Sequence, residues 1–185
     1  MGCPEKGIEL SLEEVDILAS RTSEFLAKNS SGGVLVLELD DGSYLSESVA
    51  ICRYLERLQP EPNLLGRDLR EQAEIERWNR RMELELFAAI GRTVQNTSPI
   101  FQGRFKQFPD YGEAQRTVVY ERVERMDREL NRHQFIAGDR FTIADITALV
   151  AIDIGSRLAD IKIAPELAYL TRWHELVSSL PSAKA

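Results

Sequence analysis

The first third of the chain has the hydrophobic pattern of a small α/β domain. Residues 11–18 alternate weakly and predict a short strand, and residues 23–28 predict a short helix. Residues 34–37 are apolar and partly β-branched, which favours a buried strand. The dipeptide Asp41-Gly42 is typical of tight hairpin turns, whose central residues need positive φ, and residues 43–45 would form the return strand.

The rest of the chain has helical periodicity. A helix that ends at Leu58 is followed by a proline-containing linker, residues 59–67, and then by helices alone. The pattern therefore predicts an α/β domain over residues 1–58 and an all-α domain over residues 68–185. The apolar faces that predict the helices are Ile51, Tyr54, Leu55 and Leu58; Ile75, Trp78, Met82, Leu86 and Ala89; Val119, Val123, Met126 and Leu130; residues 142–154; and Leu170, Trp173 and Val177.

Composition and charge narrow the class of partner. The 185 residues are 43% hydrophobic and 29% charged, with a formal net charge of -7 and no basic block that could follow phosphates, so nucleic acid is not an expected partner. No apolar run has the length of a membrane span, and no signal-peptide core opens the chain, which predicts a cytoplasmic protein. Cys3 and Cys52 form no metal-ligand or disulfide framework, which predicts reduced thiols and no metal site.

One local motif has a structural reading. Thr142 and Asp145 have the spacing of a capping box, in which each side chain accepts a hydrogen bond from the other residue's backbone N–H. Phe141 and Ile146 occupy the flanking positions of a hydrophobic staple. We therefore interpret Asp145 as a helix cap and not as a catalytic acid.

A second motif lies where the predicted return strand gives way to a helix. Ser46 is the expected N-cap, and Ser48 lies in the first turn, where free backbone N–H groups and the helix dipole favour a carboxylate. Glu47 beside it could accept from an ammonium group, so the pair suits a zwitterionic amino-acid moiety. The alternative is that Glu47 and Ser48 merely complete their own helix start.

The order and spacing of several motifs resemble the cytosolic glutathione transferases of bacterial type. The similarity runs from about Glu5 to near the C-terminus. The segments that carry it are residues 29–38, Asp40-Asp41-Gly42, Glu47-Ser48-Val49-Ala50-Ile51, Tyr54-Leu55, Asn63-Leu64-Leu65-Gly66, Trp78, and Phe135-Ile136-Ala137-Gly138-Asp139 ahead of the capping box.

The resemblance implies a fold, a co-substrate and site residues. The first domain would be thioredoxin-like and bind glutathione, and the helical domain would supply the pocket for a small apolar electrophile. Glu47 and Ser48 would hold the γ-glutamyl end of glutathione, and the Val34 backbone would pair with its cysteinyl part like an added strand. The chemistry would be attack by the glutathione thiolate, because the thiol is a poor nucleophile. Family members usually form homodimers.

The resemblance is incomplete at the N-terminus. The family opens with a strand and a helix whose junction carries the Tyr, Ser or Cys that hydrogen-bonds the glutathione sulfur. Here the first ten residues resemble only the end of that helix, so about 17 residues are expected to be missing, and the catalytic residue stays unassigned. Cys3-Pro4 is similar to the active-site cysteine of omega-like members but lacks the helix that should follow. Residues 11–18 would have to pair elsewhere or move beside the Val34 strand.

The second departure is at Leu35, where the family has a cis-proline. A cis bond before a residue other than proline costs ~2.5–4 kcal/mol, against about 0.5–1 before proline, so we expect a trans Val34-Leu35 bond. Ser30 also stands where family members often have proline, which loosens the loop.

Three functions remain open from the sequence. The leading hypothesis is a glutathione transferase-type enzyme. The alternative is a non-catalytic member of the fold that serves as a binding or dimerisation module. A third is a thiol-redox protein that acts through Cys3.

Overall fold

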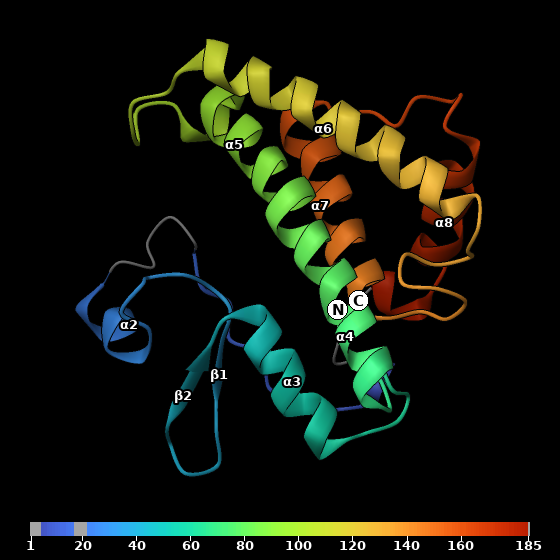
Figure 1. Cartoon of the computed structure of the whole chain (residues 1–185). Coiled ribbons are helices and arrows are strands. Elements are labelled where there is room, and N and C mark those ends of the chain that lie inside the picture. Colours follow the sequence, from blue (N-terminus) through green and yellow to red (C-terminus); the bar gives the residue numbers. More distant parts are fainter. Residues whose placement is uncertain (1–4, 17–21, 185) are drawn as a thin grey trace. The chain divides into compact units, whose positions relative to one another are not determined.

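The chain forms two compact units. The computed structural model describes residues 5–16 and 22–184. One unit ends at Asn63 and the other begins at Leu64 (Figure 1). The first contains a small sheet with helices, and the second is entirely helical. The prediction of an α/β domain followed by an all-α domain is confirmed.

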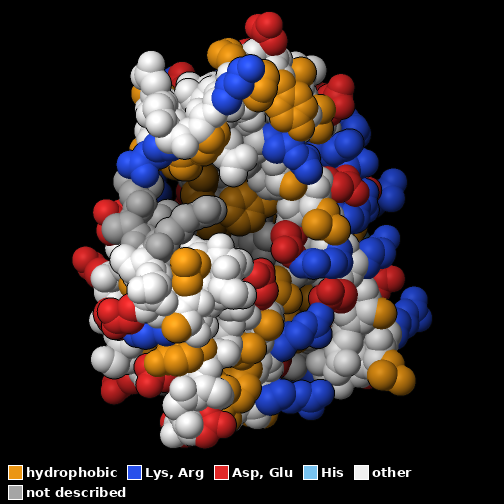
Figure 2. Space-filling model, turned by 90° about the vertical axis from the view of Figure 1, so that its left-hand side faces the viewer, with side chains coloured by type: hydrophobic (Ala, Val, Ile, Leu, Met, Phe, Trp, Pro, Cys, Tyr) orange, Lys and Arg blue, Asp and Glu red, His pale blue; other side chains and the backbone are white. Residues whose placement is uncertain are grey.

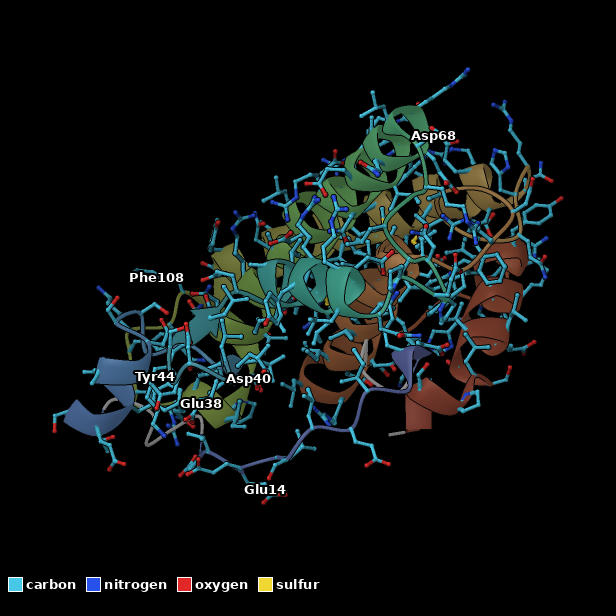
Figure 3. All side chains as sticks on the ribbon, turned by 90° about the horizontal axis from the view of Figure 1, so that it is seen from below. Glu14, Glu38, Asp40, Tyr44, Asp68 and Phe108 are labelled. Atoms are coloured by element: carbon cyan, nitrogen blue, oxygen red, sulfur yellow. The ribbon has the colours of Figure 1, made fainter. Side chains whose placement is uncertain are left out.

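A hairpin organises the N-terminal unit. Strand β1 (Val36–Glu38) pairs antiparallel with β2 (Tyr44–Ser46), so that Val36 lies opposite Ser46. The turn between them has Gly42 at φ 80° but Asp41 at negative φ, so only one of the two residues expected at positive φ is found there. Side chains of the hairpin such as Glu38, Asp40 and Tyr44 project from it (Figure 3). Helix α2 (Ser23–Lys28) precedes the hairpin, and helix α3 (Ser48–Leu58) follows it.

The strand expected over residues 11–18 is not formed. Residues 11–16 have no regular secondary structure, and the Leu12 side chain is 87% exposed; the last two residues of the predicted strand lie outside the described residues. The described part of the sheet is the β1–β2 pair alone. An isolated extended segment has no partner for its backbone N–H and C=O groups, so its weak alternation cannot by itself produce a strand.

The strand predicted over residues 34–37 begins two residues late. Val34 and Leu35 precede β1, and their side chains are 40% and 64% exposed, so neither belongs to a buried strand. The Val34-Leu35 bond is cis, and the expectation of a trans bond is wrong. That expectation considered only the intrinsic trans preference of one peptide bond. The path of the backbone between α2 and β1 depends on the fold of the whole N-terminal unit.

The end of α3 is held by a buried ion pair. Lys6 is 6% exposed, and its Nζ contacts the Glu56 carboxylate while donating to the backbone oxygens of Gln59 (2.9 Å) and Pro62 (2.6 Å). Glu56 also accepts from Asn63 Nδ2 at 2.8 Å. One lysine therefore joins the N-terminal segment to the helix and to the chain that leaves it.

The helical unit is built on one long rod. Helix α4 (Leu69–Arg81) continues through a π-helical segment, η1 (Met82–Phe87), into α5 (Ala88–Thr97) without a break. Figure 1 shows α7 beside this rod and α6 crossing its α5 end. Within the described ranges every helix is too short or too polar to cross a bilayer. The remaining elements are η2 (Pro99–Phe101), α6 (Pro109–Leu130), α7 (Ile143–Ala159), α8 (Ala168–Ser178) and η3 (Pro181–Lys184).

The predicted apolar faces of these helices meet in one core. Trp173, Leu170 and Val119 are fully buried, as the sequence pattern requires of α8 and α6. Helices α5 and α6 approach closely at Gly112, where an added Cβ would lie 2.6 Å from Cγ2 of Thr97. A residue without a side chain lets two helices approach this closely. Gly112 therefore permits the close packing of α5 against α6 at this end of the core.

At the start of α4, the Glu71 carboxylate makes hydrogen bonds that link the stability of the fold to pH. The Asp68 side chain caps the helix by accepting from the N–H groups of Arg70 and Glu71, both at 2.9 Å. The Glu71 carboxylate accepts from the Arg67 N–H at 2.7 Å and from Arg140 Nε at 2.7 Å. The Arg67 N–H first, and then Arg140, lower the pKa of Glu71 below its ordinary value of 4.5.

A carboxyl with a lowered folded-state pKa stabilises the fold above its unfolded pKa, and that contribution is lost as the pH falls through the folded-state pKa. We therefore expect Glu71→Gln to reduce the free energy of unfolding at pH 6. The difference between wild type and variant should shrink as the pH is lowered below 4.5. Urea unfolding at a series of pH values measures this, and a difference independent of pH would contradict it.

Candidate functional site

The site begins at the junction of β2 and α3. Ser46 is the last residue of β2, paired with Val36, so it cannot cap the helix, and the sequence prediction of Ser46 as N-cap is wrong. Glu47 occupies the N-cap with φ 70° and ψ 115°, and α3 starts at Ser48. Because strand pairing extends through Ser46, the chain must change from extended to helical within one residue.

Glu47 carries the backbone strain of this junction. A positive φ in a residue with a side chain costs on the order of 1–3 kcal/mol and is found most often at functional sites. In the described part of the chain only Asp160 shares this feature, at the C-terminal end of α7, where left-handed residues commonly end helices. Glu47 does not end a helix; its conformation follows from the direct passage of β2 into α3, and it places the residue at the exposed start of that helix.

The start of α3 leaves polar groups free. Ile51 N–H donates to Glu47 O at 3.0 Å, which is the first hydrogen bond of the helix. The N–H groups of Ser48, Val49 and Ala50 precede that bond and have no acceptor within the helix. Glu47 and Ser48 are exposed, and the Glu47 side chain makes no capping bond. A carboxylate acceptor, a hydroxyl and free donors thus lie together at one accessible helix end.

The strand register brings Val34 to the same end of the hairpin. Because Val36 lies opposite Ser46, the residues two positions beyond them, Val34 and Ser48, leave the sheet together. Among the described residues nothing hydrogen-bonds the Val34 backbone N–H or C=O. The three residues predicted from the sequence as a binding site, Val34, Glu47 and Ser48, thus lie at one edge of the unit.

The loop that leads into Val34 contains a residue that sequence reasoning missed. Asn29 is 8% exposed, and its Nδ2 donates to Gly33 O at 2.7 Å. The sequence signal for it is a polar residue at the C-terminal end of a short helix, ahead of Gly32-Gly33. Such a signal is common in surface loops, so it did not stand out.

Asp145 is unavailable for chemistry. The capping box with Thr142 is present, and the Asp145 carboxylate is fully buried. Its oxygens accept from the N–H groups of Thr142 and Ile136 and from Trp173 Nε1, at 2.8–2.9 Å. Burial raises the pKa of Asp145, opposed by these hydrogen bonds. The residue joins three segments of the helical unit and has a structural role.

The remaining candidate groups do not form a site. Cys3 lies outside the described residues, and Cys52 on α3 is half-buried and not in a disulfide. His174 contacts Asp153 at 2.9 Å, and His133 lies 3.7 Å from the exposed Asp139. Across residues 5–16 and 22–184, no three His, Cys, Asp or Glu side chains come together as metal ligands would.

A shallow groove, open to solvent, lies between α4, η1 and α6. Trp78, Met82 and Met126 contribute its apolar part. Arg81, Arg122 and Arg125 all form ion pairs with one carboxylate, Glu85. Since these cations already share an internal partner, we assign no ligand to the groove.

Aromatic side chains are exposed at the turn between α5 and α6. Phe105, Phe108 and Tyr111 are 45–52% exposed, and the rings of Phe101 and Phe105 lie 5.4 Å apart. Figure 2 shows hydrophobic side chains at the top of the view, the level at which Figure 1 places this turn. This is the part of the helical unit best suited to contact an apolar molecule.

Comparison with known proteins identifies both units. Residues 1–58 match the family model described as the glutathione S-transferase N-terminal domain, and residues 94–181 match that of the C-terminal domain. Glutathione S-transferase 2 of Saccharomyces cerevisiae is 33% identical over 163 residues, covering 87% of this chain and 70% of that protein. A probable elongation factor 1-gamma of Arabidopsis thaliana is 28% identical over 169 residues, but the chain spans only 39% of its length.

Solved structures agree with these matches. The crystal structure of Gtt2 from Saccharomyces cerevisiae superposes with a TM-score of 0.91 at 30% identity, covering 99% of this chain and 90% of that one. A glutathione S-transferase domain-containing protein from Marinobacter aquaeolei superposes with a TM-score of 0.90 at 33% identity, covering 98% and 91%.

Proposed function

The chain belongs to the glutathione S-transferase family, and on this premise we propose that it binds glutathione and conjugates the glutathione thiolate to apolar electrophiles. The observation that carries the proposal is the free polar edge of the N-terminal unit at Val34, Glu47 and Ser48. A strand edge can pair with the backbone of an extended tripeptide, and a helix start can bind the carboxylate of its terminal amino-acid group; this edge offers both.

The γ-glutamyl and cysteinyl parts of glutathione have chemically matched groups in this proposal. The γ-glutamyl carboxylate accepts from the Ser48 hydroxyl and from the free N–H groups of the first turn of α3. The γ-glutamyl ammonium donates to the Glu47 carboxylate. The Val34 N–H and C=O pair with the cysteinyl backbone, which fixes the sulfur next to the hairpin. No described residue is assigned to stabilise the thiolate.

The helical unit would bind the electrophile. The exposed rings of Phe105, Phe108 and Tyr111 offer flat apolar surface to an apolar electrophile. We also propose that the protein forms a homodimer, acts in the cytoplasm and uses no metal, since these properties are usual in its family.

Ser48→Ala tests the γ-glutamyl contact. In wild type, glutathione at about 100 times its Kd should raise the free energy of unfolding by about 2.7 kcal/mol. Removing one hydroxyl that bonds a charged carboxylate should weaken binding by about 1.5–3 kcal/mol. At the same glutathione concentration the shift should therefore fall to about 0.3–1.3 kcal/mol. Thermal unfolding with and without glutathione measures both values.

The matched control is Ser178→Ala. Ser178 lies at the C-terminal end of α8, and its hydroxyl has no hydrogen-bond partner among the described residues. This variant should keep the full glutathione shift. A wild-type chain that shows no shift at millimolar glutathione would count against the proposed binding and support the alternative of a non-catalytic module of the same fold.

A further inference from the structure

The chain between α2 and β1 is held by a single buried side chain. In residues 29–35 every residue is exposed or half-buried except Asn29, which is 8% exposed. Val34 and Leu35 are 40% and 64% exposed, so packing of their side chains fixes their backbone less firmly than it would for fully buried residues. The position of the Val34 peptide must therefore depend on hydrogen bonds made earlier in the loop.

Asn29 makes those hydrogen bonds. Its Nδ2 donates to Gly33 O at 2.7 Å, and its Oδ1 accepts from Ser31 N–H at 3.2 Å and from Ser31 Oγ at 3.0 Å. Ser31 Oγ in turn accepts from the Gly33 N–H at 3.2 Å. Both polar groups of Gly33, the residue before Val34, are thus tied directly or through Ser31 to one side chain.

The backbone of Asn29 completes the arrangement. Its N–H donates to Phe25 O at the end of α2, and its C=O accepts from the Gly32 N–H, both at 2.9 Å. Gly32 has φ 69°, and two consecutive glycines give the chain more freedom than any other pair. Without a network of this kind the loop would sample many conformations, and the Val34 amide would have no fixed direction.

We infer that Asn29 is a positioning residue for glutathione, because its side chain fixes the Gly33 peptide and through it the Val34 backbone that pairs with the cysteinyl part. The inference rests on the proposed function. It assigns to Asn29 a share of ligand affinity that the side chain provides without touching the ligand. Fixing the edge before binding removes the ordering cost that a mobile loop would add to the binding free energy.

The test compares Asn29→Asp with Ser30→Ala in the whole chain. Aspartate keeps an acceptor for Ser31 but cannot donate to Gly33 O. Ser30 is exposed in the same loop, and its side chain makes no hydrogen bond with a described residue. Because one neutral hydrogen bond contributes about 0.5–1.5 kcal/mol, Asn29→Asp should raise the Kd for glutathione about threefold to tenfold, while Ser30→Ala leaves it unchanged. Calorimetric titration with glutathione measures the Kd.

A second readout separates positioning from a general loss of stability. Hydrogen exchange of the Val34 amide should slow when the wild type is saturated with glutathione. In Asn29→Asp at saturation, Val34 should be less protected while the Ser48 amide keeps its protection. Equal loss of protection at both amides, or an unchanged Kd in a wild type that binds glutathione, would overturn the role of Asn29 and leave the proposed function standing. A wild type that does not bind glutathione would overturn both.

Discussion

Replacing Asp145 with alanine is expected to lower the free energy of unfolding of the helical unit by at least about 3 kcal/mol, because it leaves several buried donors without an acceptor. This carboxylate accepts hydrogen bonds from the backbone N–H groups of Ile136 and Thr142 and from the Trp173 indole N–H. Trp173 and Thr142 are no more than 1% exposed, so water cannot replace the lost acceptor. Urea unfolding followed by tryptophan fluorescence and circular dichroism measures the effect.

Two milder variants show which part of Asp145 matters. Thr142→Ala removes one member of the capping box and should cost about 0.5–2 kcal/mol, in the range for a lost cap. Trp173→Phe removes a single donor and keeps most of the ring volume, so it should cost less than Asp145→Ala. If Asp145→Ala were no more harmful than Thr142→Ala, the carboxylate would be an ordinary cap, and its bonds to Ile136 and Trp173 would contribute little.

The helical unit could be predicted from the sequence because its signals are local. The faces of α6 and α8 repeat at helical spacing, and every residue named for them is buried, including Val123 and Leu170. The capping box is a four-residue motif whose partners lie one turn apart. What could not be predicted was the reach of Asp145 to Ile136 and Trp173, since nothing in a sequence shows which distant donors meet a buried carboxylate.

The N-terminal unit was harder to predict because its structure depends on contacts between distant segments. Residues 11–16 have strand-like alternation but form no regular secondary structure, and Val34 and Leu35 are apolar yet exposed. Glu47 and Ser48 were found by residue type, whereas the conformation of Glu47 follows from where β2 stops. Asn29 was missed because its role depends on the peptide it holds. Local patterns thus identified the residues that we propose to bind glutathione, but not the residue that we propose to position them.

The buried ion pair of Lys6 could not be predicted from local sequence patterns either, and its loss should have a large effect on stability. A lysine near the start of a chain is normally read as a solvated charge, yet its side chain is 3% exposed and is paired with the Glu56 side chain, itself 9% exposed. Removing one member of a buried ion pair leaves the other charge without compensation, which typically costs about 3–5 kcal/mol. Lys6→Met should therefore destabilise the N-terminal unit by about 3–5 kcal/mol. It also removes the donor that Lys6 provides to the backbone oxygens of Gln59 and Pro62.

Both tryptophans, Trp78 and Trp173, lie in the helical unit, so fluorescence does not report this change directly. Hydrogen exchange of the buried α3 residues Ile51 and Leu55 does, and their protection should fall in Lys6→Met. The double variant Lys6→Met/Glu56→Leu should recover part of the loss, since replacing both partners by apolar groups removes the uncompensated charge. Recovery to the wild-type level would mean that the carbonyls of Gln59 and Pro62 need no donor. No recovery at all would mean that Lys6 acts through those carbonyls, and that its pairing with Glu56 contributes nothing to the stability of the unit.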